Sequence, residues 1–143
     1  MIDVRVTWEN LEEVLAGLRA LPDVLGGEVE QAIDTGLALL AGEMAIYPPA
    51  IAGSRYRRTG LLGQLWGAAS HRVQRVSVGA ELYVAGQIEN WRPGIVYVQS
   101  GEDQAPVHQG RWRTAEMVVE GMRPMVERLL QAAGDRAVER AAR

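Results

Sequence analysis

The chain has 143 residues, which suits a single domain, and 48% of them are hydrophobic, as in ordinary globular proteins. It contains no Cys and all 15 basic residues are Arg, which excludes disulfides, thiol chemistry, lysine-dependent phosphate loops and Schiff bases. The net charge is −3, the start lacks a signal-peptide pattern and no apolar run approaches the roughly 20 residues of a membrane span, so we expect a soluble chain made in the cytoplasm, with no membrane contact.

The first part of the chain is predicted to form a strand and two helices. Residues 2–8 alternate apolar and polar, which is typical of a half-buried strand or arm, and Asn10 with Glu13 resembles a capping box before a short helix. A longer helix is expected after Pro22, with an apolar stripe at steps of three and four residues: Leu25, Val29, Ile33, Leu37, Leu40 and Met44. The Tyr47-Pro48-Pro49 step predicts its end, because proline lacks an amide donor and restricts the residue before it.

The middle of the chain is predicted to hold a loop, a helical turn and a β-hairpin. Residues 48–58 are loop-like, and Thr59 suits the N-cap of a short turn whose inward residues are Leu61, Leu62, Leu65 and Trp66. Two valine-rich runs, 71–79 and 81–89, are typical of strands, and Gly79-Ala80 can turn the hairpin between them.

The last part is predicted to be mostly helical. A turn at 91–94 leads to an apolar stretch of either type at 95–99 and a loop at 100–111, and Thr114 can cap a helix from Ala115. Pro124 suits the first position of a renewed helix, whose charged tip from Asp135 onward is expected to fray. The apolar face of that helix comprises Val126, Leu129, Leu130, Ala133 and Ala137.

These elements predict an α+β fold in one domain over residues 1–143. An N-terminal strand or arm and a long helix come first, a small antiparallel β-sheet lies in the middle, and a helix ends the chain. We expect no second domain, because neither an internal repeat nor a low-complexity linker interrupts the sequence.

The sequence offers little for catalysis. His71 and His108 are not in HExxH or at metal-ligand spacing, and Ser70 beside His71 is no triad signature. The adjacent acids Glu12 and Glu13 would point about 100° apart on a helix, so they cannot jointly flank a substrate. No GxGxxG or GxxxxGK[ST] is present. We therefore predict that the protein is not an enzyme and uses no metal and no cofactor.

Charge is unevenly spread along the chain. Residues 45–80 hold no acid and five basic residues, which makes this block +5 and the remainder −8: Arg55, Arg57, Arg58, Arg72 and Arg75. Such a division suggests contacts between copies of the chain or with a charged neighbour. A solvated loop with no partner is the alternative.

The most distinctive stretch runs from Tyr47 to Trp66. Arg55, Arg57 and Arg58 offer fork-shaped donors around Tyr56, an amphipathic anchor, so a docking loop is one interpretation. Aromatic and Arg residues interleaved in this way could also follow a nucleic-acid backbone, although dedicated binders usually have a basic domain. A capped turn after a proline-stopped helix, with no binding role, is the third.

At this stretch the sequence resembles the tail-completion or head–tail joining (neck) proteins of long-tailed bacteriophages and prophages. Their signature is Tyr-Pro-Pro, a spacer, Tyr-x-Arg-Thr-Gly, a Leu and a Trp, and it reads YPPAIAGSRYRRTGLLGQLW here, with Leu65 where Ser is frequent. A second, weaker block comprises Tyr97-Val98, Gln104-Ala105, His108 and Gly110-Arg111-Trp112. The C-terminal helix matches in position, so the resemblance covers about residues 25–135.

The resemblance implies a non-enzymatic virion component, made in the host cytoplasm and located in the neck or tail. Such subunits form rings, commonly six-fold, between a head-side connector and the tail terminator or tail tube, and DNA passes through the lumen without sequence-specific binding. The residues expected to contact, or to support contacts with, the next subunit or ring are Arg55, Tyr56, Arg57, Arg58, Trp66, Arg111 and Trp112.

Three other interpretations stay open. Trp66 and Trp112 are also candidates for core residues, because large aromatic side chains are usually buried. A host-encoded protein-interaction module that uses the Arg-rich loop is the alternative function. A nucleic-acid-binding module is the third.

Overall fold

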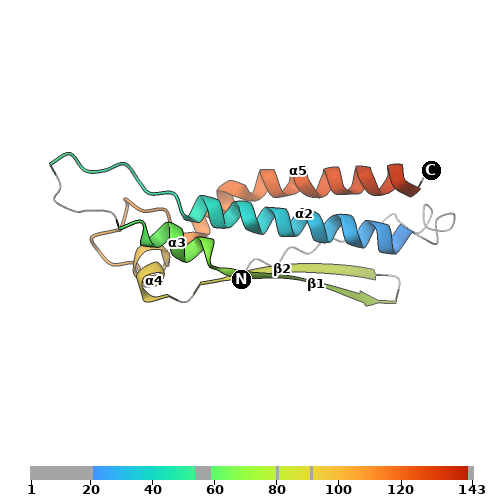
Figure 1. The fold of residues 1–143 in the computed structure, drawn as a ribbon, viewed down its shortest axis with the longest axis horizontal. Coiled ribbons are helices and arrows are strands. Elements are labelled where there is room, and N and C mark those ends of the chain that lie inside the picture. The colour runs from blue at the N-terminus through green and yellow to red at the C-terminus, as the bar shows by residue number, and fades with distance from the viewer. Residues whose placement is uncertain (1–20, 54–58, 80, 91, 142–143) are drawn as a thin grey trace. The chain divides into compact units, whose positions relative to one another are not determined.

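The structure is a computed structural model, and it describes residues 21–53, 59–79, 81–90 and 92–141. Its elements in chain order are α2 (Leu21–Met44), α3 (Leu61–Gly67), β1 (Ser70–Val78), β2 (Glu81–Glu89), α4 (Pro93–Gln99) and α5 (Ala115–Ala141) (Figure 1). The strand predicted at 2–8 and the short helix after it lie outside the described residues. Helices and one two-stranded sheet confirm the predicted α+β class.

The helix α2 follows its predicted stripe. Every residue of that stripe, from Leu25 to Met44, is buried. The helix ends three residues before Tyr47, through a turn in which the Ile46 amide donates to the Glu43 carbonyl at 3.2 Å. The prolines therefore follow the helix end, as the sequence predicts.

The start of α3 differs from the prediction. Gly60, not Thr59, is the N-cap, and its φ of 75° lies in the left-handed region that only glycine adopts without strain. The Thr59 hydroxyl instead accepts from the Leu61 amide at 3.3 Å. Leu62 and Trp66 are buried as predicted, but Leu61 is 51% exposed, because a seven-residue helix presents only one narrow face inward.

The hairpin is confirmed. Strands β1 and β2 are neighbours joined by two residues, which requires them to be antiparallel. The predicted turn at 91–94 is wrong in its second half, because α4 already begins at Pro93. The fixed φ of proline suits this first helical position, and Arg92 is the N-cap. The stretch 95–99, open from sequence, is helical.

The helix α5 begins as predicted, since the Thr114 hydroxyl accepts from the Met117 amide at 3.3 Å. The predicted renewal at Pro124 is wrong: α5 is continuous, with Pro124 in its interior. Buried residues on both sides of the proline, Val118 and Met122 before it and Ala133 and Ala137 after it, offset the lost amide bond. The predicted fraying from Asp135 is also wrong, because the helix runs to Ala141.

Contacts divide the chain into two compact units, each built from separate segments. Of the described residues, the first unit holds 21–37, 71–88 and 123–141, and the second holds 38–53, 59–70, 89–90 and 92–122. Helices α2 and α5 each contribute to both units. Neither unit is a continuous stretch of sequence, and the prediction of one domain stays a prediction.

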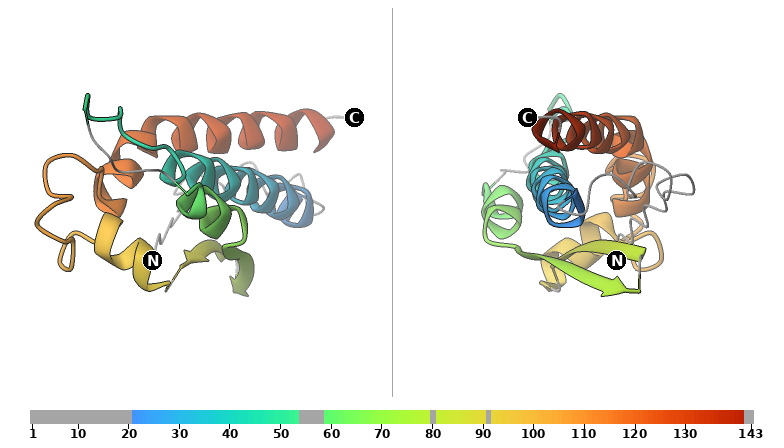
Figure 2. Two further views of the ribbon diagram at one scale, coloured as in Figure 1. Left: turned by 60° about the vertical axis from the view of Figure 1, so that its left-hand side comes forward. Right: turned by 90° about the vertical axis from the view of Figure 1, so that its right-hand side faces the viewer.

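In the first unit, α2 lies between α5 and the hairpin (Figures 1 and 2). The shared core comprises Leu25, Val29, Ile33 and Leu37 from α2, Val84 from β2 and Ala137 from α5. Gly86 allows β2 to approach α2 closely, since a Cβ there would collide with the side chains of Ile33 and Leu37. In this unit a helix and a two-stranded sheet therefore both pack against α2.

A buried carboxylate joins α2 to α5 in this unit. Glu28 is 2% exposed, and its two oxygens lie 2.6 Å from Arg136 Nε and 2.6 Å from an Arg140 nitrogen. The hydrogen bond from Arg136, together with the charges of both arginines, lowers the pKa of the Glu28 carboxyl below its ordinary value of 4.5, although burial acts in the opposite direction. These two bonds hold the last turns of α5, which explains why its tip does not fray.

Candidate interaction site

Buried amides tie the second unit together. The Trp66 indole Nε1 donates to Gln99 Oε1 at 2.7 Å, and Gln99 Nε2 donates to the Met44 carbonyl at 2.7 Å. Gln99 is 3% exposed and Trp66 7%. One side chain of α4 thus satisfies a donor on α3 and an acceptor at the end of α2.

A second amide closes the loop between α4 and α5. Gln104 Nε2 donates to the Val98 carbonyl at 2.6 Å and to the Trp112 carbonyl at 3.2 Å. The Trp112 ring packs edge to face against Tyr47, with centroids 5.4 Å apart. The loop therefore folds back on α4 and on the segment that follows α2.

The Arg-rich segment is held near both of its ends. The Tyr47 hydroxyl accepts from the Leu62 amide at 3.1 Å, and the Arg111 guanidinium donates to the Pro49 carbonyl at 3.2 Å. Between these anchors lie the predicted contact residues Arg55, Tyr56, Arg57 and Arg58, all of which fall outside the described residues. The described contacts hold the residues on either side of this stretch.

The two predicted tryptophans belong to the core. Trp66 and Trp112 are each 7% exposed, as their interpretation as core residues requires, while their expected part in contacts with the next subunit or ring stays a prediction. Burial inside the unit satisfies the Trp66 indole and leaves little of either ring for a partner.

Residues of the second block have mixed positions. The Arg111 guanidinium is engaged with Pro49, and Tyr97 is 59% exposed. His108 packs edge to face on Trp112, with ring centroids 6.0 Å apart, and its Nδ1 is buried without a partner among the described residues. This histidine is placed by packing rather than by a catalytic partner.

Two arginines of the +5 block, Arg72 and Arg75, lie on β1 in the first unit. Arg72 donates to Gln87 at 2.6 Å, and Arg75 pairs with Glu30 at 3.4 Å, both inside the first unit. Within the first unit, His71 Nε2 also lies 2.9 Å from Asp34. The arginines of β1 therefore have partners within their own unit, and the docking interpretation is carried by the segment between Tyr47 and Leu62 alone.

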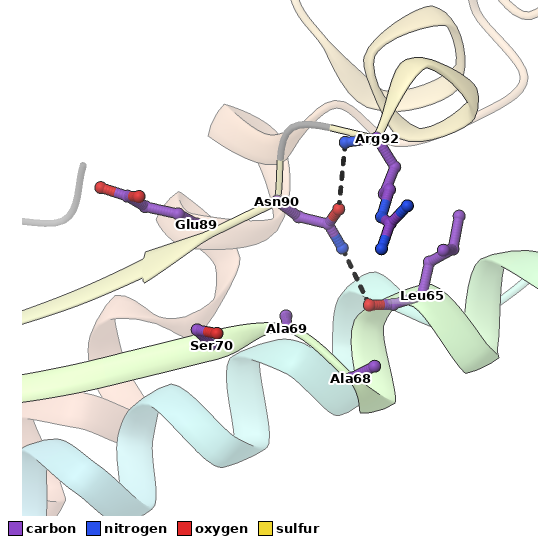
Figure 3. Close-up of a pocket in the computed structure, with 7 residues that line it drawn as sticks. All are labelled: Leu65, Ala68, Ala69, Ser70, Glu89, Asn90 and Arg92. Atoms are coloured by element: carbon purple, nitrogen blue, oxygen red, sulfur yellow. Dashed lines mark hydrogen bonds between the residues drawn. The ribbon is translucent and has the colours of Figure 1, made fainter.

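A pocket with a volume of about 290 Å³ lies in the second unit, beside the end of α3 (Figure 3). Asn90 builds it: its Nδ2 donates to the Leu65 carbonyl at 2.9 Å, and its Oδ1 accepts from the Arg92 amide at 3.3 Å. The pocket is lined by Leu65, Ala68, Ala69, Ser70, Glu89, Asn90 and Arg92. In Figure 3 the Arg92 side chain extends over it while that of Glu89 points away.

Sequence reasoning missed Gln99, Asn90 and the pocket, and it named Gln104 only as part of the second block, without its role as a donor to two carbonyls. Neutral amides carry no charge or periodic signal, so their roles emerge only when the chain brings a donor and an acceptor to each of them.

Among the described residues, no group of three or more His, Asp or Glu side chains is placed to hold a metal ion. No described helix combines the length and apolar character needed to cross a bilayer.

Comparison with known proteins returned no match: no protein-family model, no curated protein and no solved structure matches this chain.

Proposed function

We propose that the chain is a structural subunit of a phage-like virion that acts at the head–tail junction. In this proposal it assembles into a ring, commonly six-fold in the proteins that the sequence resembles, between a head-side connector and the tail. DNA passes through the lumen without sequence-specific contact. The segment with Arg55, Tyr56, Arg57 and Arg58 docks on the next subunit or ring.

One observation carries the proposal beyond the sequence resemblance. The two blocks that resemble neck proteins, 47–66 and 97–112, contact each other inside one unit. Tyr47 packs on Trp112, Arg111 bonds to Pro49, and Trp66 bonds to Gln99 beside the second block. Two motifs far apart in sequence thus contact each other through described residues on both sides of the Arg-rich segment.

The chemistry of that segment suits assembly rather than catalysis. Guanidinium groups form bidentate bonds with carboxylates, and the chain carries 18 acids against 15 arginines, so acidic surface is available on further copies. Ring contacts need two different patches on each subunit. An acidic lumen would also avoid holding the passing DNA by its phosphates.

The decisive experiment deletes the gene in the strain that encodes it and examines induced particles by electron microscopy. The proposal expects filled heads and separate tails, with joined particles restored by the wild-type gene. Labelled protein in the restored particles should sit at the neck. Joined, infectious particles from the deletion strain, or a label spread along the tail, would refute it.

A further inference from the structure

The pocket beside Asn90 has a cation without a partner. Among the described residues no group pairs with the Arg92 guanidinium, whereas Arg111 and Arg113 of the same unit bond to Pro49 and Glu43. The Asn90 amide fixes the Arg92 backbone against the end of α3. Arg92 therefore offers a guanidinium donor from a backbone position that the Asn90 hydrogen bonds fix.

Size and lining indicate what the pocket can hold. A volume of about 290 Å³ corresponds to roughly ten water molecules and lies just below the about 300–1,000 Å³ of small-molecule sites. Leu65, Ala68 and Ala69 supply apolar wall next to the guanidinium. The arrangement suits acidic side chains from a protein surface, with their methylenes on the wall and a carboxylate on Arg92.

The same unit presents such acids on an ordered turn. The amides of Glu102 and Asp103 donate to the Ser100 hydroxyl at 3.3 and 3.1 Å, which fixes the turn while both residues are exposed. Within the described part of the chain neither carboxylate has a partner. Glu43, by contrast, is paired with Arg113.

Arg92 and this acidic turn stand at opposite ends of α4. Arg92 caps its start and Ser100 its end, so about 10 Å of helix separates them at 1.5 Å per residue. The two unmatched charges do not meet within one copy. They are two different patches on one unit, as a head-to-tail contact between identical copies requires.

We propose that the Arg92 pocket of one copy receives the Glu102–Asp103 turn of the next. The guanidinium binds the carboxylates through charge-assisted hydrogen bonds, and repetition of the contact propagates a ring or a filament. The occupant is a second copy of this chain, and the contact deepens the proposed function, on which it rests for its place in the virion.

The test is a charge swap followed by sedimentation velocity over a concentration series. Wild-type protein should form concentration-dependent oligomers that weaken with added salt. Arg92→Glu and the double variant Glu102→Arg/Asp103→Arg should each associate at least about tenfold more weakly. An equimolar mixture of the two variants should regain association, because each supplies the intact half that the other lacks.

Arg128→Glu and Glu127→Arg are matched controls, since both are exposed on α5, and should associate like wild type. A monomeric wild-type protein, an unchanged Arg92→Glu variant or a mixture that stays monomeric would each overturn the contact. Its failure is separate from that of the virion proposal. A neck label with Arg92-independent oligomers refutes only the contact, and Arg92-dependent oligomers in a protein absent from the neck refute only the virion role.

Discussion

Gln99 shows how much of the second unit depends on single amide side chains. An amide offers two donors and an acceptor without charge, so it can serve a buried donor and a buried acceptor at once. Gln99 does this for Trp66 and Met44, while Gln104 serves two carbonyls around the following loop. The Gln99 bonds join α4 to a side chain of α3 and to the last residue of α2.

Replacing Gln99 with Leu tests this role. The change keeps a similar volume but leaves the Trp66 indole N–H and the Met44 carbonyl buried without partners, each at about 1–3 kcal/mol. We expect the free energy of unfolding to fall on the order of 3 kcal/mol, measured by urea titration. Gln64→Leu at an exposed position of α3 is the control and should change stability little. A stable Gln99→Leu protein would contradict this account.

The lowered pKa of Glu28 predicts that the stability of the protein depends on pH. Its pKa is lowered by folding, so its contribution to stability is present above its ordinary value of 4.5 and is lost as the pH falls through the folded pKa. Glu28→Gln should therefore unfold at lower urea than wild type at pH 7, and the gap should shrink below pH 4.5. The exposed Glu127→Gln should show no such convergence. A gap independent of pH would show that the carboxylate charge is not involved.

At the scale of elements, α2 supplies buried side chains to both units. Its stripe supplies the core of the first unit and continues into the second, where Leu40 and Met44 are buried. β2 lies close to this helix because Gly86 has no side chain, whereas β1 is exposed along almost its whole length. The two strands of the hairpin therefore have different surroundings: β2 packs against α2, whereas most of β1 is exposed to solvent.

Two glycine substitutions separate packing from backbone effects in this unit. Gly86→Ala forces a methyl group into Ile33 and Leu37 and should lower stability by about 1–3 kcal/mol. Gly27→Ala lies on the open side of α2 with no atom within 4 Å and should raise it by about 0.5–1 kcal/mol. Thermal unfolding of both variants measures the contrast. Equal effects would mean that β2 does not approach α2 as described.

On the scale of the whole molecule, charge is the property that connects the units to an assembly. The first unit engages four of its arginines internally: Arg72 with the neutral Gln87, Arg75 with Glu30, and Arg136 and Arg140 with Glu28. The Arg-rich segment and Arg92 are the basic groups that our proposals direct toward other chains. Both belong to segments of the second unit.

Charge reversal in the Arg-rich segment tests docking on complete particles. The double variant Arg57→Glu/Arg58→Glu should fold normally, with an unchanged circular dichroism melt, yet fail to restore infectious particles to the deletion strain. Arg128→Glu is the matched exposed control and should restore them. Normal infectivity from the double variant would remove the docking role and leave the segment as a solvated loop.

Much of the fold was predictable because local patterns and local chemistry agree. The stripe of α2, the Thr114 cap and the hairpin each follow from residues within a few positions of one another. The errors lie where a distant contact overrides a local signal. Glu28 holds the end of α5 through Arg136 and Arg140, and packing on both sides carries α5 through Pro124.

Patterns in the sequence were enough to predict the fold class, the helix stripe, the absence of thiol and lysine chemistry and the unusual character of the stretch 47–66. Three features could be seen only in the folded chain: the burial of Trp66 and Trp112, the bonds by which Gln99 and Gln104 close the second unit, and the position of Arg92 at a pocket with no partner among the described residues. The reason is physical: periodicity reports which face of an element is apolar, whereas the partner of a buried amide or an arginine depends on which distant backbone atoms the fold brings within 3 Å of it.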